Sequence, residues 1–147
     1  MNRPKKIELT GQDACRLGRK LPLAELGFDA AKVSGPSPSG SFPGNKECLF
    51  NGLAGGPTLL VTPVTNEGMD SYLPTTADQV TQIEIDGFPG AVVKPLRTKT
   101  TCFGVVDVAD GQLLSVKVGS ALGPEGLQDK YCAAIPRVAS AAVAVAG

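Results

Sequence analysis

Four cysteines spread along the sequence limit this fold more than any other feature. Cys15, Cys48, Cys102 and Cys132 are separated by 33, 54 and 30 positions, and no Cys-x-x-Cys pair occurs. A zinc ribbon or a thioredoxin-like site is therefore unsupported. Three interpretations remain: a zinc site built from scattered cysteines, four buried free thiols in a cytoplasmic protein, or two disulfides. We favour two disulfides because the cysteine count is even and the chain is small, weakly charged and free of histidine.

The sequence allows three disulfide pairings. We favour Cys15 with Cys48 and Cys102 with Cys132, because each bond then closes a loop of about 30 residues and stabilises the fold by roughly 3–4 kcal/mol. The pairing of Cys15 with Cys132 and Cys48 with Cys102 stays open. Either pairing indicates an oxidising compartment outside the cytoplasm.

Composition and charge exclude several classes of function. The 147 residues suit one domain, and 42% hydrophobic with 19% charged residues indicates a chain that folds. Fourteen basic and fourteen acidic residues balance, which argues against a nucleic-acid binder. Without histidine, a Ser-His-Asp triad, a Cys-His dyad and a histidine metal site are all excluded. We therefore expect neither an enzyme nor a cofactor, and no catalytic residue is assigned.

Short apolar runs bounded by turn residues predict three β-hairpins. The turns are Asn51–Pro57, Asp86–Gly90 and Asp110-Gly111. The strand pairs are, in order, Glu47–Gly52 with Thr58–Val64, Val80–Ile85 with Gly90–Pro95, and Thr101–Ala109 with Gln112–Ser120.

Two aspartates and a glycine in the third hairpin raise the question of a metal site. Asp107, Asp110 and Gly111 lack the further oxygen ligands of a calcium loop, because strand-like residues follow them. Asp-Gly between apolar runs instead predicts a type I′ turn at Asp110 and Gly111. Ala109 would then pair with Gln112, and the face that carries Phe103, Val105 and Ala109 would be the core face. Asp107 would lie on that face as a buried charge, opposite Leu114.

Helices are expected at both ends of the chain. Thr10 can cap a short helix, and Pro22 begins a second helical turn that Gly27 ends. The alanine-rich segment from Pro124 to the end reads as helix, with a kink or a fresh start near Ile135 because Pro136 follows. Residues 1–9 read as a polar lead-in and residues 10–147 as one disulfide-stabilised domain. The element order predicts an α+β fold, an antiparallel sheet of about three hairpins with N- and C-terminal helices packed on it.

The segment Ser34–Gly44 is rich in serine, proline and glycine, and we expect a surface loop that carries neither a helix nor a strand ladder. Its functional interpretation is a binding loop with Phe42 as the apolar contact.

No apolar run is long enough for a membrane-spanning helix, and the basic start lacks the apolar region of a signal peptide. Either the protein is cytoplasmic with four reduced cysteines, or an export signal precedes this sequence.

Five segments, taken in order, carry a resemblance to a known family. They are DACRL near the start, ECLF, DGFPGAVV, CFGVVDVADGQLLSVKV and KYCAAIPRVASAAV. They resemble actinobacterial cell-envelope lipoproteins that carry the domain of unknown function numbered three-five-five-eight, from about Asp13 to the end. Ala14 stands where that family usually has proline.

The resemblance implies an exported protein, often lipid-anchored, with residues 1–9 on the anchor side. It implies no activity and no catalytic residues, and its fold would be similar to the PsbP and Mog1-like α/β/α sandwiches. We therefore expect a non-catalytic binding or accessory domain on the outer face of the cell membrane or secreted, with an unknown protein or small-molecule partner. Contact with the membrane would come only through a lipid anchor that this chain does not contain. A hydrolase that uses carboxylate and Ser/Thr residues is the alternative outside the cytoplasm.

Overall fold

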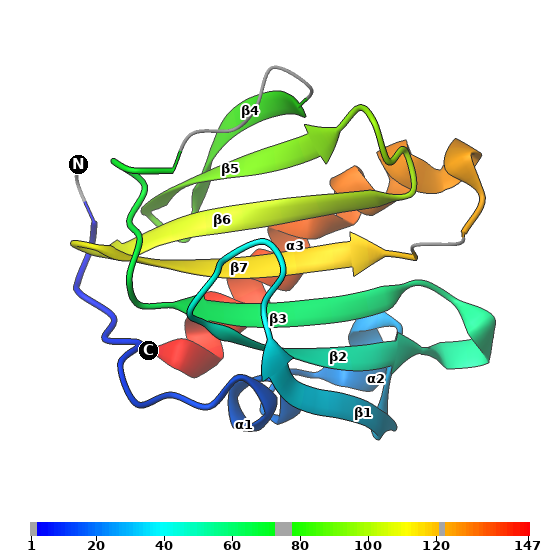
Figure 1. The fold of residues 1–147 in the computed structure, drawn as a ribbon, viewed down its shortest axis with the longest axis horizontal. Helices are drawn as coiled ribbons and strands as arrows, with labels where there is room; N and C mark the ends of the chain where they lie inside the picture. Colours follow the sequence, from blue (N-terminus) through cyan, green and yellow to red (C-terminus); the bar gives the residue numbers. More distant parts are fainter. Residues whose placement is uncertain (1–2, 73–77, 121–122) are drawn as a thin grey trace.

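A seven-stranded antiparallel sheet forms the centre of the protein in a computed structural model that describes residues 3–72, 78–120 and 123–147 (Figure 1). The strand order is β1-β2-β3-β7-β6-β5-β4, so the pairing of β3 with β7 joins the two halves of the sheet. The strands are β1 (Phe28–Pro38), β2 (Lys46–Gly52), β3 (Thr58–Val64), β4 (Asp78–Ile85), β5 (Phe88–Pro95), β6 (Thr101–Ala109) and β7 (Gln112–Gly119).

The three predicted hairpins are confirmed as β2–β3, β4–β5 and β6–β7. The type I′ turn, however, lies at Asp86-Gly87, where both residues have positive φ (50° and 87°). At Asp110-Gly111 only Gly111 has positive φ, at 72°. The turn predicted there exists between Ala109 and Gln112, but it is not type I′.

The segment Ser34–Gly44 is not a loop throughout, which corrects our prediction. Its first five residues belong to β1, and Ser34 and Pro38 pair with residues of β2. Because β1 is an edge strand, one row of its backbone groups needs no partner, and prolines are tolerated there. Pro36 lies in an irregularity of register between Ser34 and Ser37.

A β-bulge at Val108 changes the register that the turn predicts. Ala109 pairs with Gln112 as expected, but Asp107 pairs with Leu113 instead of Leu114. Val108 is the extra residue, and its carbonyl accepts a hydrogen bond of 2.9 Å from the backbone N–H of Ile7 instead of from β7.

The side of β6 that faces the larger core also differs from our prediction. The larger core contains Val106 and Val108 from β6, on the opposite side from the face we predicted. Phe103 and Val105 belong to a smaller cluster on the other face. Both faces of β6 are therefore covered by apolar side chains. The sequence of β6 alone could not show which face packs against the larger core.

The α-helices of the described residues pack on one face of the sheet (Figure 1). They are α1 (Ala14–Arg19), α2 (Leu23–Leu26) and the long α3 (Gln128–Ala146). The helix α3 packs on β6 and β7, and α1 packs on β2 and β3. The other face carries the smaller cluster, to which the connecting segments contribute Phe42, Met69 and Tyr72. The α+β class is confirmed, whereas the described residues form two layers rather than an α/β/α sandwich.

Details of the helices differ from the sequence prediction. The cap of α1 is Asp13 rather than Thr10, because its side chain accepts a hydrogen bond from the backbone N–H of Arg16. Gly27 ends α2 in the left-handed conformation, as predicted. The helix α3 continues through Pro136 without a fresh start.

The lead-in segment contributes to the core. Ile7 and Leu9 are almost completely buried in the larger cluster. Residues 3–9 therefore pack along the domain that follows them.

Candidate functional site

The two disulfides attach helices to the sheet. Cys15 in α1 bonds to Cys48 in β2, and Cys102 in β6 bonds to Cys132 in α3. The pairing that we favoured is confirmed, and no cysteine is free. Two disulfides in a small domain are typical of proteins in oxidising compartments, so this structure fits an extracellular location.

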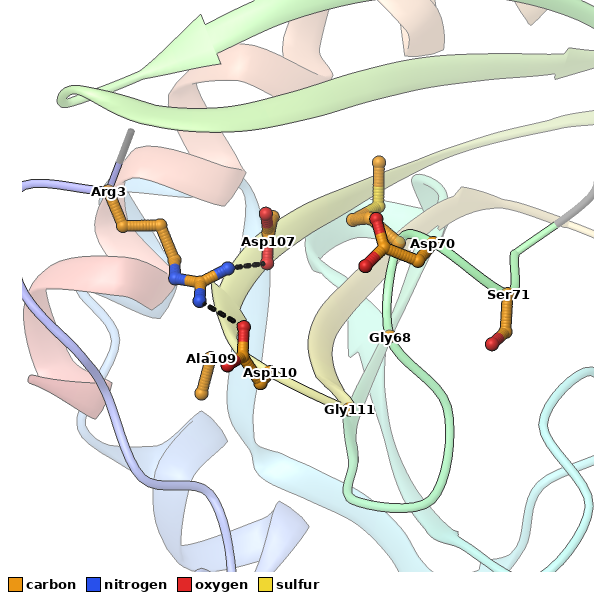
Figure 2. A pocket seen from close by; sticks show the side chains of 9 residues that line it. Arg3, Gly68, Asp70, Ser71, Asp107, Ala109, Asp110 and Gly111 are labelled. Atoms are coloured by element: carbon orange, nitrogen blue, oxygen red, sulfur yellow. Dashed lines mark hydrogen bonds and ion pairs between the residues drawn. The ribbon is translucent and has the colours of Figure 1, made fainter. Parts of the chain in front are cut away.

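A small polar pocket lies at the end of the β6–β7 hairpin (Figure 2). It has a volume of about 210 Å³, and its lining residues include Arg3, Asp70, Ser71, Asp107 and Asp110. Arg3 reaches in from the N-terminal segment, donating to Asp107 Oδ1 at 2.7 Å and to Asp110 Oδ1 at 2.6 Å. In Figure 2, Ser71 lies on the far side of Asp70 from Asp107.

The ion pair with Arg3 explains the buried charge that the sequence left without a role. The Asp107 side chain is only 4% exposed and that of Arg3 is 20% exposed, whereas Asp110 is fully exposed. A buried carboxylate is tolerated when a cation and hydrogen bonds compensate it. No local pattern in the sequence points to Arg3, because the pair joins residues 104 positions apart.

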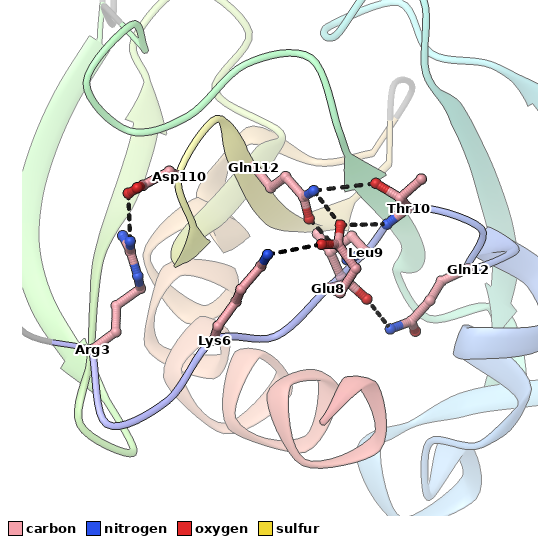
Figure 3. A network of polar contacts seen from close by, with 8 residues as sticks. All are labelled: Arg3, Lys6, Glu8, Leu9, Thr10, Gln12, Asp110 and Gln112. Atoms are coloured by element: carbon pink, nitrogen blue, oxygen red, sulfur yellow. Dashed lines mark hydrogen bonds and ion pairs between the residues drawn. The ribbon is translucent and has the colours of Figure 1, made fainter.

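A hydrogen-bond network centred on Gln112 also joins the N-terminal segment to the β6–β7 hairpin (Figure 3). The Gln112 side chain accepts a hydrogen bond from the backbone N–H of Leu9 and donates to Glu8 and to Thr10 Oγ1. Hydrogen bonds from Gln112, then Thr10 and Lys6, lower the pKa of Glu8 to about 2. Residues 3–12, which we call the N-terminal strap, are thereby held against the β6–β7 hairpin.

An apolar groove is lined by residues from the start of α3, from α2 and from the β2–β3 connection. Figure 1 shows these elements at the end of the sheet opposite the β6–β7 turn. We call this groove the α3 groove. Its volume is about 520 Å³, and its lining residues include Phe28, Pro57, Val118, Leu127, Tyr131 and Val138. Among its lining residues, Phe28 and Tyr131 are buried and Leu127 is exposed at 38%. Lys130 and Ser120 also line the groove and supply its polar groups.

The two cavities differ in what they can bind. Ligand sites in proteins are commonly apolar clefts of about 300–1,000 Å³ with a few polar groups, and the α3 groove fits this description. The polar pocket is smaller, and its most buried group, Asp107, already has a partner in Arg3. The α3 groove is therefore the candidate functional site.

Sequence reasoning did not find this groove, because its walls come from segments far apart in the chain. Tyr131 and Phe28 belong to no motif of the sequence, and Phe28 only follows the glycine that ends α2.

The predicted binding residue, Phe42, does not face solvent. It is 4% exposed and packs in the smaller cluster, with its ring centroid 6.1 Å from that of Tyr72. Burial raises the pKa of the Tyr72 hydroxyl above its usual value. Asp110 and Gly111 form the predicted turn and also line the polar pocket.

Across residues 3–72, 78–120 and 123–147, no three Asp, Glu, Cys or His side chains gather in a way that could hold a metal ion. In the same ranges no helix is long and apolar enough to cross a membrane.

Comparisons with known proteins identify a family but no characterised relative. The model of the family described as "Protein of unknown function (DUF3558)" matches residues 1–145. No curated protein and no solved structure matches the chain significantly.

Proposed function

The chain belongs to the DUF3558 family of proteins of unknown function, and we propose that it is a non-catalytic binding domain of the cell envelope. It acts outside the cytoplasm, either exported or held by a lipid anchor. Its ligand occupies the α3 groove.

The two disulfides support the proposed location outside the cytoplasm. Reducing conditions in the cytoplasm keep most thiols free, whereas both bonds here join a helix to the sheet and no cysteine is left over. A cytoplasmic domain with four reduced cysteines is the less favoured alternative for this reason.

The α3 groove is the single observation that carries the binding role. A folded domain normally fills its apolar interior, yet here Phe28, Val118 and Tyr131 line an open space of about 520 Å³. Lys130 lies on the same lining, is exposed, and adds a positive charge beside the apolar surface. The groove therefore suits an apolar molecule that carries one anionic group.

The dye 1-anilinonaphthalene-8-sulfonate tests this role, because it joins an apolar ring system to an anionic sulfonate. The dye fluorescence reports transfer from water into an apolar site. We expect saturable binding of one dye per folded chain. Binding should weaken with Lys130→Ala, which removes the positive charge.

Two tryptophan variants on the same helix form a matched pair. Ala134 lines the α3 groove, so Ala134→Trp fills the space and should abolish dye binding. Ala133 is exposed and does not line it, so Ala133→Trp should bind the dye as the unmodified chain does. Equal binding by the two variants, or no binding by the unmodified chain, would contradict the proposal.

The polar pocket supports a hydrolase less well than the α3 groove supports a binding role. It contains carboxylates and Ser71, but Asp107 is bound to Arg3. A general base needs to reach the proton that it abstracts. The Arg3 pair supports a structural role for the pocket, which is to hold the N-terminal strap.

A further inference from the structure

Three exposed leucines lie at one end of the sheet, each in a different connection. Leu53 belongs to the β2–β3 connection, Leu96 to the β5–β6 connection, and Leu127 lies just before α3. Their exposed fractions are 43%, 43% and 38%, and among the described residues only one other large apolar side chain, Val80, is exposed. Single exposed leucines are ordinary, but a group of them at one end indicates a surface that meets an apolar partner.

The strand register places the three connections together. Thr58 and Thr101 are both aligned with Gly119, so the ends of β3, β6 and β7 form one row across the sheet. The segments that carry the leucines precede Thr58, precede Thr101 and follow Gly119. Figure 1 shows them at the end of the sheet away from the β6–β7 turn, whereas the C-terminus lies at the other end.

Hydrogen bonds fix these segments relative to one another. The side-chain amide of Gln128, at the start of α3, donates to the carbonyls of Pro95 at 2.5 Å and of Thr101 at 3.0 Å, one on each side of the β5–β6 connection. The backbone N–H of Leu53 donates to the carbonyl of Gly27 at 3.0 Å. The connections are therefore held in place before any partner binds, which lowers the entropy that binding costs.

Positive charge accompanies the leucines. Arg97 and Lys99 are exposed and follow Leu96 in the β5–β6 connection, and Lys130 is exposed in the first turn of α3. In the described part of the three connections, Glu125 is the only acidic residue. Because the formal net charge of the whole chain is zero, this end is positive through the placement of its charges.

The acidic residue at the start of α3 does not cancel this charge. Asp129 lies beside Lys130 in the sequence, but its Oδ1 is 2.6 Å from Lys94 Nζ of β5. That pair is neutral as a whole, so the cations of the β5–β6 connection keep their excess.

We propose that the three leucines, together with Arg97 and Lys99, form a surface that docks on a lipid bilayer containing anionic lipids. We call it the leucine surface. Its leucines enter the boundary between headgroups and acyl chains, and its cations meet anionic headgroups. A bilayer fits because it offers apolar and anionic groups side by side over an area that spans all three connections. The proposal goes beyond the binding role of the α3 groove and needs no ligand there.

Flotation of the full chain with lipid vesicles tests the proposal. One set of vesicles contains phosphatidylcholine alone, and the other contains equal parts of phosphatidylcholine and phosphatidylglycerol. Each cation near an anionic membrane surface contributes about fivefold in binding, so the chain should bind the anionic vesicles at least about tenfold more tightly. Added salt should weaken this binding, because it screens the attraction between the cations and the headgroups.

Apolar variants separate the leucine surface from other exposed apolar residues and from the groove. Replacing Leu53 and Leu96 together by serine should weaken binding to anionic vesicles by about tenfold, because both lose an apolar contact. Val80→Ser is the matched control, since Val80 is 39% exposed and lies in β4, and it should bind as the unmodified chain does. Neither leucine lines the α3 groove, so dye binding there should stay unchanged.

Charge variants separate local from overall charge. Replacing Arg97 and Lys99 together by glutamine should weaken binding to anionic vesicles by about tenfold or more. Replacing Arg16 and Lys20 by glutamine removes the same charge from a site beside the C-terminal Gly147, and this control should bind as the unmodified chain does. Circular dichroism confirms that all variants are folded.

A charge reversal gives a result that loss of folding cannot imitate, because Glu125→Lys should strengthen binding to anionic vesicles. The proposal is overturned if the chain binds neither kind of vesicle, if it binds both equally, or if the two pairs of charge variants lose the same affinity. Sedimentation without vesicles tests for a second copy as the occupant. A dimer that the serine variant of Leu53 and Leu96 disperses would also overturn the proposal.

Discussion

Removing Arg3 should destabilise the whole domain, although Arg3 lies near the end of the chain. The substitution Arg3→Met keeps the length of the side chain and removes the guanidinium from Asp107, whose side chain is 4% exposed. Breaking a fully buried ion pair costs about 3–5 kcal/mol. Because Arg3 is 20% exposed and water can partly replace it, we expect a loss of about 2–3 kcal/mol. For a chain of this size that corresponds to a decrease in Tm of roughly 6–10 °C.

Urea unfolding at pH 7 measures this loss, and a double-mutant cycle assigns it to the pair. Once Asp107→Asn has removed the buried charge, Arg3→Met should have a much smaller effect, with a coupling energy of about 1 kcal/mol or more. Asp110→Asn is the matched control, because the second carboxylate of Arg3 is fully exposed and should contribute less than about 1 kcal/mol. An Arg3→Met variant within about 0.5 kcal/mol of the unmodified chain would refute this interpretation of the buried pair.

Three further predictions concern the strap and the core. The Glu8 pKa of about 2 lies below its ordinary 4.5, so the stability that its carboxylate provides is complete above pH 4.5 and is lost as the pH falls toward 2. Glu8→Gln should therefore flatten the dependence of unfolding free energy on pH in that window, and parallel curves would contradict this. A Cβ at Gly104 would lie 2.5 Å from Ile135 Cγ2, so Gly104→Ala should cost about 1–3 kcal/mol in urea unfolding. Adding Ile135→Ala should relieve part of that loss, whereas strictly additive losses would argue against a clash. Replacing Cys102 and Cys132 together by serine should lower the unfolding free energy by about 3–4 kcal/mol, and an unchanged Tm would contradict the stabilising role of that bond.

The hairpins could be predicted because the residues that determine a strand and its turn are neighbours in the sequence. Thr58–Val64 and Thr101–Ala109 have the predicted bounds, since turn residues lie on both sides of each apolar run. Such strand and turn positions depend on a few neighbouring residues, and the rest of the chain does not override them. The disulfide pairing was favoured on loop length instead, because its cysteines lie 33 and 30 positions apart.

Other features depend on the position of a segment in the finished sheet. Prolines in Ser34–Gly44 argued against a strand, but an edge position tolerates them. The bulge at Val108 has no sequence signal, because the group that satisfies its carbonyl is the N–H of Ile7, about a hundred positions away. The predicted register and core face of β6 were therefore wrong.

The candidate site is the least predictable part for the same reason. The α3 groove combines Phe28, Val118 and Tyr131, which come from β1, β7 and α3. Each residue alone looks like an ordinary core residue in the sequence. Only their arrangement around an open space of about 520 Å³ indicates a binding role.

The oxidation state of the four cysteines in the producing cell is the decisive measurement. Protein isolated from its own cells is treated with an alkylating reagent under denaturing conditions, without prior reduction, and its intact mass is recorded. A disulfide-stabilised domain that works outside the cytoplasm should gain no alkyl group before reduction and four after it, with peptides that link Cys15 to Cys48 and Cys102 to Cys132. Four alkyl groups gained without reduction would show a cytoplasmic protein with reduced cysteines and would contradict the proposed location.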